Sequence, residues 1–247
     1  MVKKISETFR HLLMKVITRI RNVELVTYKE GISHSQILPN ATYSPWKDDA
    51  GFISLYEQIK YNTLVDIYRC YELYSFAKSV QYIEADVLEV GVWKGGTARL
   101  LSQFIDGNNT LYLADTFEGV VKASYKDSLY KGGEHNDTSE TIVNELLGSS
   151  AKQNTVLLTG IFPEATGDMV KNKSFKLVHI DVDTHNSAKD TFEFIWDRLV
   201  PGGIVVFDDY GFNGCEGVTD YFNKLSLKNV VKLYNINGHG IIIKTAR

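Results

Sequence analysis

Val87-Leu88-Glu89-Val90-Gly91-Val92-Trp93-Lys94-Gly95-Gly96-Thr97-Ala98 is the stretch that decides the fold of this chain. It begins as a short apolar run typical of a strand, and its three glycines then predict a tight turn where the backbone can approach a ligand closely. Helical composition follows over residues 97–105, and a second apolar strand is expected over residues 111–114. Strand, glycine turn, helix and strand form the repeating unit of a parallel α/β sheet.

The second strand of this unit ends at Asp115, 24 positions after Gly91. A carboxylate at the carboxyl end of a parallel strand can accept hydrogen bonds from a ribose diol. The glycine pattern is G-x-x-x-G-G, which differs from the G-x-G-x-x-G of dinucleotide enzymes. Glu89 would disfavour a pyrophosphate, but it suits a cofactor with a cationic amino-acid end. We therefore interpret the unit as a site for S-adenosylmethionine, with an ordinary α/β turn as the alternative.

The expected cofactor contacts lie on the loops that follow the predicted strands. The loop after Asp115 should cross the ribose edge, and the turn after a third strand (residues 155–159) can hold an adenine. The residues predicted to bind the cofactor are Glu89, Gly91, Trp93, Gly95, Thr97, Asp115, Thr116, Phe117, Gly160, Ile161 and Asp181.

Two further apolar strands end in pairs of acids. Asp181 and Asp183 follow the first of these strands, and Asp208 and Asp209 follow the second. A helix capped by Ser187 should connect them in a right-handed crossover, so that all four acids reach the same edge of the sheet. The crossover helix is expected to run to about Val200, and Pro201-Gly202-Gly203 should turn the chain into the second strand.

Converging acids repel one another unless a cation joins them. Carboxylate oxygens suit magnesium, and no cysteine–histidine spacing in the sequence indicates zinc. We therefore predict a Mg²⁺ site at Asp181, Asp208 and Asp209. Taken one at a time, each of these acids would more often be a helix cap or a solvated loop residue.

The polar, glycine-containing stretch 121–140 predicts a mobile cover over the site. His135 lies within it and is placed for proton transfer, although a loop histidine is usually just solvated. The candidates for the catalytic proton acceptor are Asp181, Asp183, His185 and His135. A helix near residues 139–147 and a closing pair of strands over residues 230–234 and 240–244 complete the expected elements.

The N-terminal residues 1–22 have a different character, because they form a basic amphipathic helical pattern. Such a helix can lie on a membrane surface, but we expect it to pack on its own domain or on a second subunit of a homo-oligomer. Residues 23–50 are expected to be irregular. We divide the chain into an N-terminal helical extension and cover (residues 1–80) and a Rossmann-like core (residues 81–247).

Composition limits the partners and the compartment. With 247 residues and 44% hydrophobic content, the chain suits one α/β domain with additions. A net charge of −3 gives no reason to expect nucleic acid, and two cysteines are too few for a disulfide framework. No run is long enough to cross a bilayer, and no signal peptide is evident, so we expect a cytoplasmic protein.

In combination, these motifs resemble the macrocin and mycinamicin type of O-methyltransferase, which act on sugars of macrolide antibiotics. The shared stretches lie between about Asn40 and Gly217, and they are residues 43–46, 68–73, 88–97, 114–117, 179–183 and 207–210. The resemblance implies a Rossmann-like class I methyltransferase fold with a mostly parallel seven-stranded sheet and helices on both faces. It also implies S-adenosylmethionine, a divalent metal bound by Asp181, Asp208 and Asp209, and Asp115 as the ribose carboxylate.

One departure from the pattern of related metal-dependent methyltransferases bears on the substrate. Small metal-dependent catechol methyltransferases place a lysine shortly after the first metal aspartate, whereas this chain has Thr184-His185-Asn186. A catechol is therefore disfavoured, and we expect a hydroxyl of a sugar in a natural-product glycoside or glycan. The alternatives are a phenol or another small hydroxyl compound as acceptor, or a non-catalytic or nicotinamide-binding Rossmann module.

Overall fold

The computed structural model describes residues 9, 16, 26–29, 32–35, 44–235 and 237–246. The chain divides into two compact units, residues 1–45 and residues 46–247. In the first unit, β1 (Val26–Lys29) and β2 (Ile32–Ser35) pair antiparallel, where the sequence predicted irregular structure. Strands of four residues are too short to give a clear alternation. The helix predicted over residues 1–22 lies outside the described residues, apart from Phe9 and Val16.

The second unit is built around a seven-stranded sheet in the order β5-β4-β3-β6-β7-β9-β8. The strands from β5 to β7 pair parallel, whereas β9 runs antiparallel to β7 and β8. This confirms the predicted sheet, including its closing pair of strands. The strands are β3 (Asp86–Val90), β4 (Leu111–Asp115), β5 (Thr155–Thr159), β6 (Phe175–Ile180), β7 (Leu199–Phe207), β8 (Val230–Tyr234) and β9 (Gly240–Lys244).

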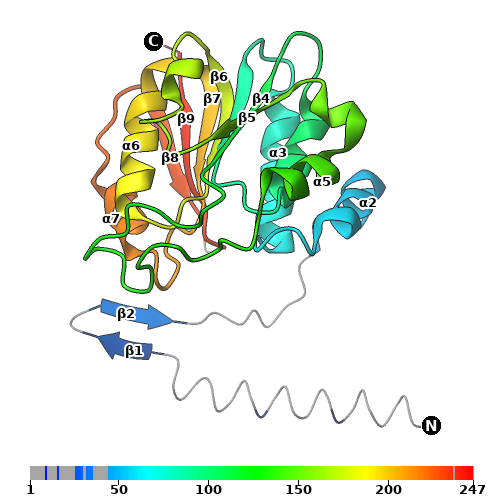
Figure 1. Ribbon diagram of the computed structural model, residues 1–247. Coiled ribbons are helices and arrows are strands. Elements are labelled where there is room, and N and C mark those ends of the chain that lie inside the picture. The colour runs from blue at the N-terminus through cyan, green and yellow to red at the C-terminus, as the bar shows by residue number, and fades with distance from the viewer. Residues whose placement is uncertain are drawn as a thin grey trace. The chain divides into compact units, whose positions relative to one another are not determined.

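Helices cover both faces of this sheet (Figure 1), and each face has its own apolar cluster. Helices α2 to α5 pack on one face, and α6 and α7 pack on the other. The α-helices are α2 (Ala50–Ile59), α3 (Ile67–Val80), α4 (Gly96–Leu101), α5 (Glu140–Lys152), α6 (His185–Ile195) and α7 (Glu216–Lys224). Short 3₁₀ turns are η1 (Ser102–Phe104), η2 (Gly167–Met169) and η3 (Trp196–Arg198).

Side-chain caps explain where several helices begin. Asp49, Asp66 and Ser139 accept hydrogen bonds from backbone N–H groups of the first turns of α2, α3 and α5. The prediction that Ser187 caps α6 is wrong, because Thr184 is the N-cap and Ser187 lies in the first turn. The Ser187 hydroxyl is already engaged, since it accepts a hydrogen bond from Thr184 Oγ1 at 2.9 Å.

The predicted division at residue 80 differs from the observed one at residue 45. Helices α2 and α3 belong to the larger unit because they bury apolar side chains against the sheet. Phe52 and Leu73 are fully buried and lie in the same cluster as Val87 of β3. No helix in the described part of the chain combines the length and hydropathy of a membrane span.

The turn after β3 packs directly on the turn after β6. Gly91 has φ +88°, and a Cβ atom there would lie 1.6 Å from the backbone carbonyl oxygen of Asp181. The Asp181 N–H also donates to the Val90 carbonyl at 2.9 Å, which holds the two turns together. Glycine is therefore required at this position by backbone packing as well as by its positive φ.

Gly91→Ala should lower the free energy of unfolding by more than ~3 kcal/mol, because it combines an overpacked contact with a disfavoured φ. The matched control is Gly107→Ala, at φ +57° with no atom within 4 Å of the added Cβ. The free energy of unfolding of that variant should fall only by the ~1–2 kcal/mol that the left-handed conformation costs a non-glycine residue. Urea unfolding measures both, and equal losses would contradict the tight contact with Asp181.

Candidate active site

A cavity of about 300 Å³ lies at the carboxyl ends of the parallel strands. Its wall comes from the segments that follow β3, β4, β5, β6 and β7 and from residues 62–65. The predicted site residues that line it are Gly91, Trp93, Thr97, Asp115, Thr116, His135, Gly160, Asp181, Asp183, Asp208 and Asp209. Glu89, Gly95, Phe117, Ile161 and His185 are not among the lining residues.

Asp115 connects two loops at one end of the cavity. Its Oδ2 accepts the backbone N–H groups of Val92 at 2.7 Å and Trp93 at 2.9 Å. Its Oδ1 accepts the N–H of Phe117 at 2.7 Å. Trp93 and Phe117 both have positive φ, +47° and +56°, which this carboxylate helps to hold. Phe117 therefore supports the site through its backbone.

The glycine turn leads into a short helix whose first N–H is already bonded. Gly95 is the left-handed residue before α4, and its Cβ position faces Val143 of α5 at 3.2 Å. The N–H of Gly96 donates to the Asn62 carbonyl at 2.9 Å. Gly95 thus allows close packing against α5 and Gly96 against residues 62–63, whereas Gly91 and Thr97 line the cavity.

Glu89 lies beneath α3 and does not reach the cavity. It sits opposite His179 in the β3–β6 register, and its Oε1 is 2.8 Å from His179 Nδ1. Both side chains are fully buried. Because side chains alternate along a strand, Glu89 shares the sheet face of Val87 instead of pointing over the strand end. The structure therefore brings Glu89 to a buried ion pair, and not to the predicted cofactor contact.

The four predicted acids do converge. Asp181 follows β6 and Asp208 and Asp209 follow β7, and these three offer ligand oxygens that all lie within 4.8 Å of one another. Asp183 and Asp209 both have φ +60°, an uncommon conformation for aspartate. Asp183, Asp209 and Cys215 form a second such group of ligand atoms.

The pKa values of these acids diverge. Burial, followed by the charges of Asp208 and other neighbouring acids, raises the pKa of both Asp181 and Asp209 well above the ordinary range. Burial also raises the pKa of Asp183. For Asp208, burial acts in the same upward direction, but the His179 and His239 rings and the Arg69 charge outweigh it and lower the pKa. Asp208 is thus the acid of the group whose negative charge is balanced by neighbouring cationic side chains.

Arg69 is the functional residue that the sequence did not reveal. Its Nη1 donates to Asp208 Oδ2 and lies 3.2 Å from Asp209 Oδ1. Its Nε donates to Asp66 Oδ2 at 2.9 Å, within the first turn of α3. The pairing with Asp66 agrees with the i,i+3 spacing, but the contact with the acids joins residues 139 and 140 positions apart. The signal available in the sequence was an arginine within a dense run of apolar and aromatic residues.

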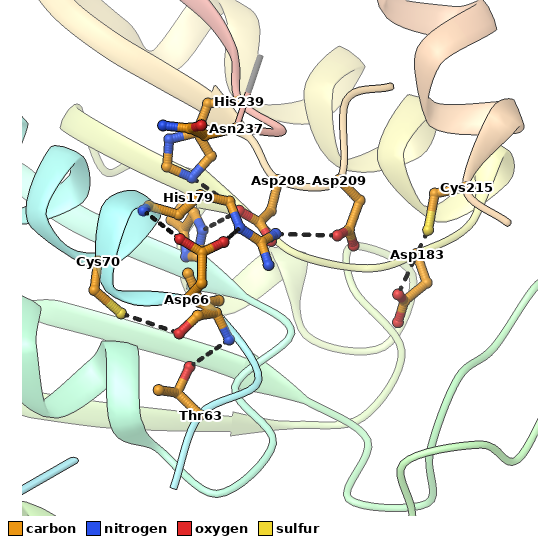
Figure 2. A network of polar contacts seen from close by, with 12 residues as sticks. Thr63, Asp66, Cys70, His179, Asp183, Asp208, Asp209, Cys215, Asn237 and His239 are labelled. Carbon is orange, nitrogen blue, oxygen red and sulfur yellow. Dashed lines mark hydrogen bonds and ion pairs between the residues drawn. The ribbon is translucent and has the colours of Figure 1, made fainter. Parts of the chain in front are cut away.

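Two buried histidines complete the surroundings of Asp208 (Figure 2). Its Oδ1 lies 2.8 Å from His239 Nε2 and 3.9 Å from His179 Nε2. His239 Nδ1 also pairs with Glu72, which comes from α3. Burial alone would lower the pKa of His179, but Asp208 and Glu89 raise it to about 10. Asp208 is therefore held by cationic groups on both of its oxygens.

The loop after β4 brings His135 and Tyr130 to the cavity. His135 has φ +62°, and its ring centroid lies 5.9 Å from that of Tyr130. Tyr130 hydrogen-bonds to the Asp183 carboxylate, and burial raises the pKa of the phenol further, so the phenol stays protonated. The end of the loop is tied to the glycine turn, because Asp137 accepts Trp93 Nε1 at 2.8 Å and Lys94 Nζ at 2.5 Å.

His185 lies away from the cavity, at the start of α6. Its backbone N–H donates to Asp127 Oδ1 at 2.8 Å, and its Nε2 is 2.7 Å from Lys126 Nζ. The ring is buried and packs edge-on to Tyr221. These contacts place His185 in the support of the loop, so it is a poor candidate for the proton acceptor.

The acid cluster fits a hard divalent cation. Asp181, Asp208 and Asp209 supply carboxylate oxygens that all lie within 4.8 Å of one another. Burial, and then the charge of Asp208, raises the pKa of Asp181 and Asp209, and a bound cation would favour their charged forms. Asp208 is already engaged on both oxygens, so it would have to share an oxygen with such a cation.

The profile of the macrocin-O-methyltransferase (TylF) family matches residues 62–244, which include the loops after β3 and β4 and the acid cluster. The chain belongs to this family. The match begins in the segment before α3 and ends in β9, so it spans almost the whole of the larger unit. This confirms the family resemblance seen in the sequence motifs.

Two related proteins are named as O-methyltransferases. The chain is 24% identical over 173 residues to "8-demethyl-8-(2,3-dimethoxy-alpha-L-rhamnosyl)-tetracenomycin-C 4'-O-methyltransferase" of Streptomyces olivaceus, covering 64% of this chain and 65% of that protein. It is 26% identical over 165 residues to "Mycinamicin III 3''-O-methyltransferase" of Micromonospora griseorubida, covering 60% and 65%. The matches thus span less than two thirds of these relatives' length.

Solved structures show the same fold. The O-methyltransferase NovP has a TM-score of 0.62 at 19% identity, covering 75% of this chain and 83% of its own. CalS11, a calicheamicin methyltransferase, has a TM-score of 0.62 at 15% identity, covering 85% and 99%. The predicted Rossmann-like class I methyltransferase fold is therefore confirmed.

The two adjacent acids should respond in opposite ways to neutralisation in the metal-free protein. Asp209→Asn should stabilise it, because burial and its acidic neighbours raise the pKa of Asp209 and disfavour the charged form. Asp208→Asn should destabilise it by ~3–5 kcal/mol, because it removes the partner of buried cations. Thermal unfolding in EDTA at pH 7 measures both.

The effect of Asp209→Asn should also depend on pH. A raised folded-state pKa means that ionisation costs stability only above the unfolded pKa, so the gain should be absent near pH 4 and grow towards pH 7. A gain that stays constant with pH would contradict the assignment of Asp209 as a buried acid whose charge Arg69 balances only in part.

Proposed function

We propose that this protein is an S-adenosylmethionine-dependent O-methyltransferase that methylates a hydroxyl of a sugar with the help of a divalent cation, Mg²⁺ by preference. One observation carries the proposal: Asp115 and the cluster of Asp181, Asp208 and Asp209 line the same cavity. A ribose-binding carboxylate and a set of oxygen ligands thus face one space, which suits transfer between a nucleoside cofactor and a chelated hydroxyl.

The cofactor half depends on the loops joined by Asp115. Three backbone N–H groups are bonded to this carboxylate, two at Oδ2 and one at Oδ1, so of its roughly four lone-pair sites the one left on Oδ1 can accept a hydroxyl of a ribose. Trp93, Thr97 and Thr116 supply the neighbouring wall, and Gly160 directly follows β5, where we place the adenine. This half needs no movement of the backbone, because the carboxylate already holds both loops.

The acceptor half depends on the acids. A bound divalent cation would lower the pKa of a coordinated sugar hydroxyl. Asp181, Asp208 and Asp209 would hold the cation through their oxygens. Asp183 is the proton acceptor that the geometry favours, because it lines the cavity beside them and its raised pKa makes it a stronger base. Tyr130 donates to Asp183 and orients it, and His135 stands next to Tyr130.

The sugar acceptor is the finer part of the proposal. It is supported by the family and by the names of the two relatives, which refer to a methylated rhamnosyl compound and to mycinamicin III. Incubation with S-adenosylmethionine, Mg²⁺ and a panel of deoxysugar glycosides should give a product heavier by one methyl group. Catechol is the control acceptor, and methylation of catechol without any glycoside product would overturn the sugar assignment.

The oligomeric state, the compartment and the lack of a nucleic-acid partner are expectations from the sequence. We propose a homo-oligomer in the cytoplasm, with no nucleic-acid partner. Cys70 and Cys215 are both buried as free thiols, a state that a reducing compartment preserves. Light scattering of the purified chain measures its oligomeric state, and a monomer at micromolar concentration would contradict the proposal.

Asp115→Ala should weaken binding of S-adenosylhomocysteine by roughly tenfold or more, since charge-assisted hydrogen bonds are worth ~1.5–3 kcal/mol each. Part of the loss should come from the two loops, because three of their backbone N–H groups lose their hydrogen-bond acceptor. Asp220→Ala, which removes an ion-paired acid from α7, is the charge-matched control. Calorimetric titration measures both, and unchanged binding to the Asp115 variant would remove the ribose assignment.

Removal of metal should abolish turnover without preventing cofactor binding. EDTA is expected to lower the methylation rate by several orders of magnitude, and added Mg²⁺ should restore it, because the acceptor hydroxyl loses its activation. S-adenosylhomocysteine should bind equally well in EDTA, since Asp115 is not one of the grouped metal-ligand residues. Full activity in EDTA would show that chelation is no part of the reaction.

A further inference from the structure

Arg69 is built into the acid cluster from several sides. It is 7% exposed, on the first turn of α3, where Asp66 both caps the helix and accepts the Arg69 Nε–H. The turn before β9 closes over its stem, because a Cβ atom at Gly238 would lie 3.5 Å from Arg69 Cδ. The guanidinium is therefore fixed in place and does not swing in from solvent.

The guanidinium binds the oxygens that a metal would need. Its Nη1 donates to Asp208 Oδ2 and lies 3.2 Å from Asp209 Oδ1. The other oxygen of Asp208 faces His239 Nε2 at 2.8 Å. Among the grouped ligands Asp181, Asp208 and Asp209, two are thus in contact with one fixed cation.

We propose that Arg69 is the internal counter-ion of the acid cluster and limits its affinity for divalent metal, because the metal must share Asp208 and Asp209 with the guanidinium. This inference rests on the proposed function, in which these acids hold the cation. An arginine side chain keeps its charge at any relevant pH, so it cannot yield by losing a proton. It therefore holds the acids together without metal and weakens the potential that attracts one.

The charges of the cluster favour competition between Arg69 and the metal over a purely supporting role of Arg69. Arg69, His179 and His239 supply three cationic groups next to four cavity-lining aspartates, so the acids still outnumber the cations and can attract a further one. Like charges a few ångströms apart repel strongly in a buried site, and a divalent ion bound to Asp208 would lie close to the guanidinium. A supporting role alone would predict that removing Arg69 loosens the metal.

The experiment measures metal binding directly, with Mn²⁺ as the probe and without substrate. Electron paramagnetic resonance of free Mn²⁺ gives the dissociation constant for wild type, Arg69→Met and Arg69→Lys. Methionine keeps the apolar stem without charge, and lysine keeps the charge without the planar fork. Arg198→Met is the control, since Arg198 bonds to the Lys171 and Phe194 carbonyls away from the cavity.

Arg69→Met should bind Mn²⁺ at least tenfold more tightly than wild type, with Arg69→Lys between them and Arg198→Met unchanged. In EDTA, Arg69→Met should unfold at a lower temperature than wild type, and added Mn²⁺ should raise its Tm by more than it raises that of wild type. If Arg69→Met does not fold without metal, Arg69→Lys carries the comparison on its own.

Equal or weaker Mn²⁺ binding by the Arg69 variants, while wild type binds well, would overturn the inference and leave the metal site standing. Absence of binding to wild type with binding to Arg69→Met would support the inference in its strongest form, with Arg69 in the place of the metal. If no variant binds Mn²⁺, the inference and the metal half of the proposed function both fail, whereas the cofactor half is tested separately by S-adenosylhomocysteine.

Discussion

Mutual repulsion among buried carboxylates is the constraint on which this structure depends. Asp181, Asp183, Asp208 and Asp209 all line one cavity because the parallel strands β6 and β7 end at the same edge. The compensating cations come from three separate elements: Arg69 from α3, His179 from β6, and His239 from the turn before β9. The acids thereby connect the first helices of the unit to its last strand.

A second connection joins the two ends of the cavity. The turn that carries Trp93 is held on one side by the Asp115 carboxylate and on the other by Asp137 of the covering loop. The same loop carries Tyr130, which binds Asp183. A change in the position of the loop would thus affect both the turn that carries Trp93 and the carboxylate of Asp183.

Much of the sheet could be predicted from the sequence, because strands covered by helices on both faces appear as short apolar runs between turn residues. The runs at residues 155–159, 230–234 and 240–244 coincide with β5, β8 and β9. The start of β7 could not be predicted. Its register with β6 shifts between Phe175 and Leu177, so that the expected Pro201-Gly202-Gly203 turn lies within the strand.

The acids of the site could be predicted for a similar reason, since residues just after strands in a parallel sheet must meet at one edge. The partners of those acids could not. The contact of Arg69 with Asp208 joins residues 139 positions apart, and only the packing of α3 on the sheet brings them together. The position of Glu89 could not be predicted either, because its spacing from the glycine turn in the sequence does not reveal which face of β3 it occupies.

The β8–β9 hairpin has a consequence for how the protein is made. β9 pairs directly with β7 and is the last strand of the sheet in chain order. A growing chain on the ribosome therefore exposes the edge of β7, and leaves Asp208 without His239, until this hairpin has been translated. The acid cluster therefore has all of its cationic partners only after β9 has joined the sheet.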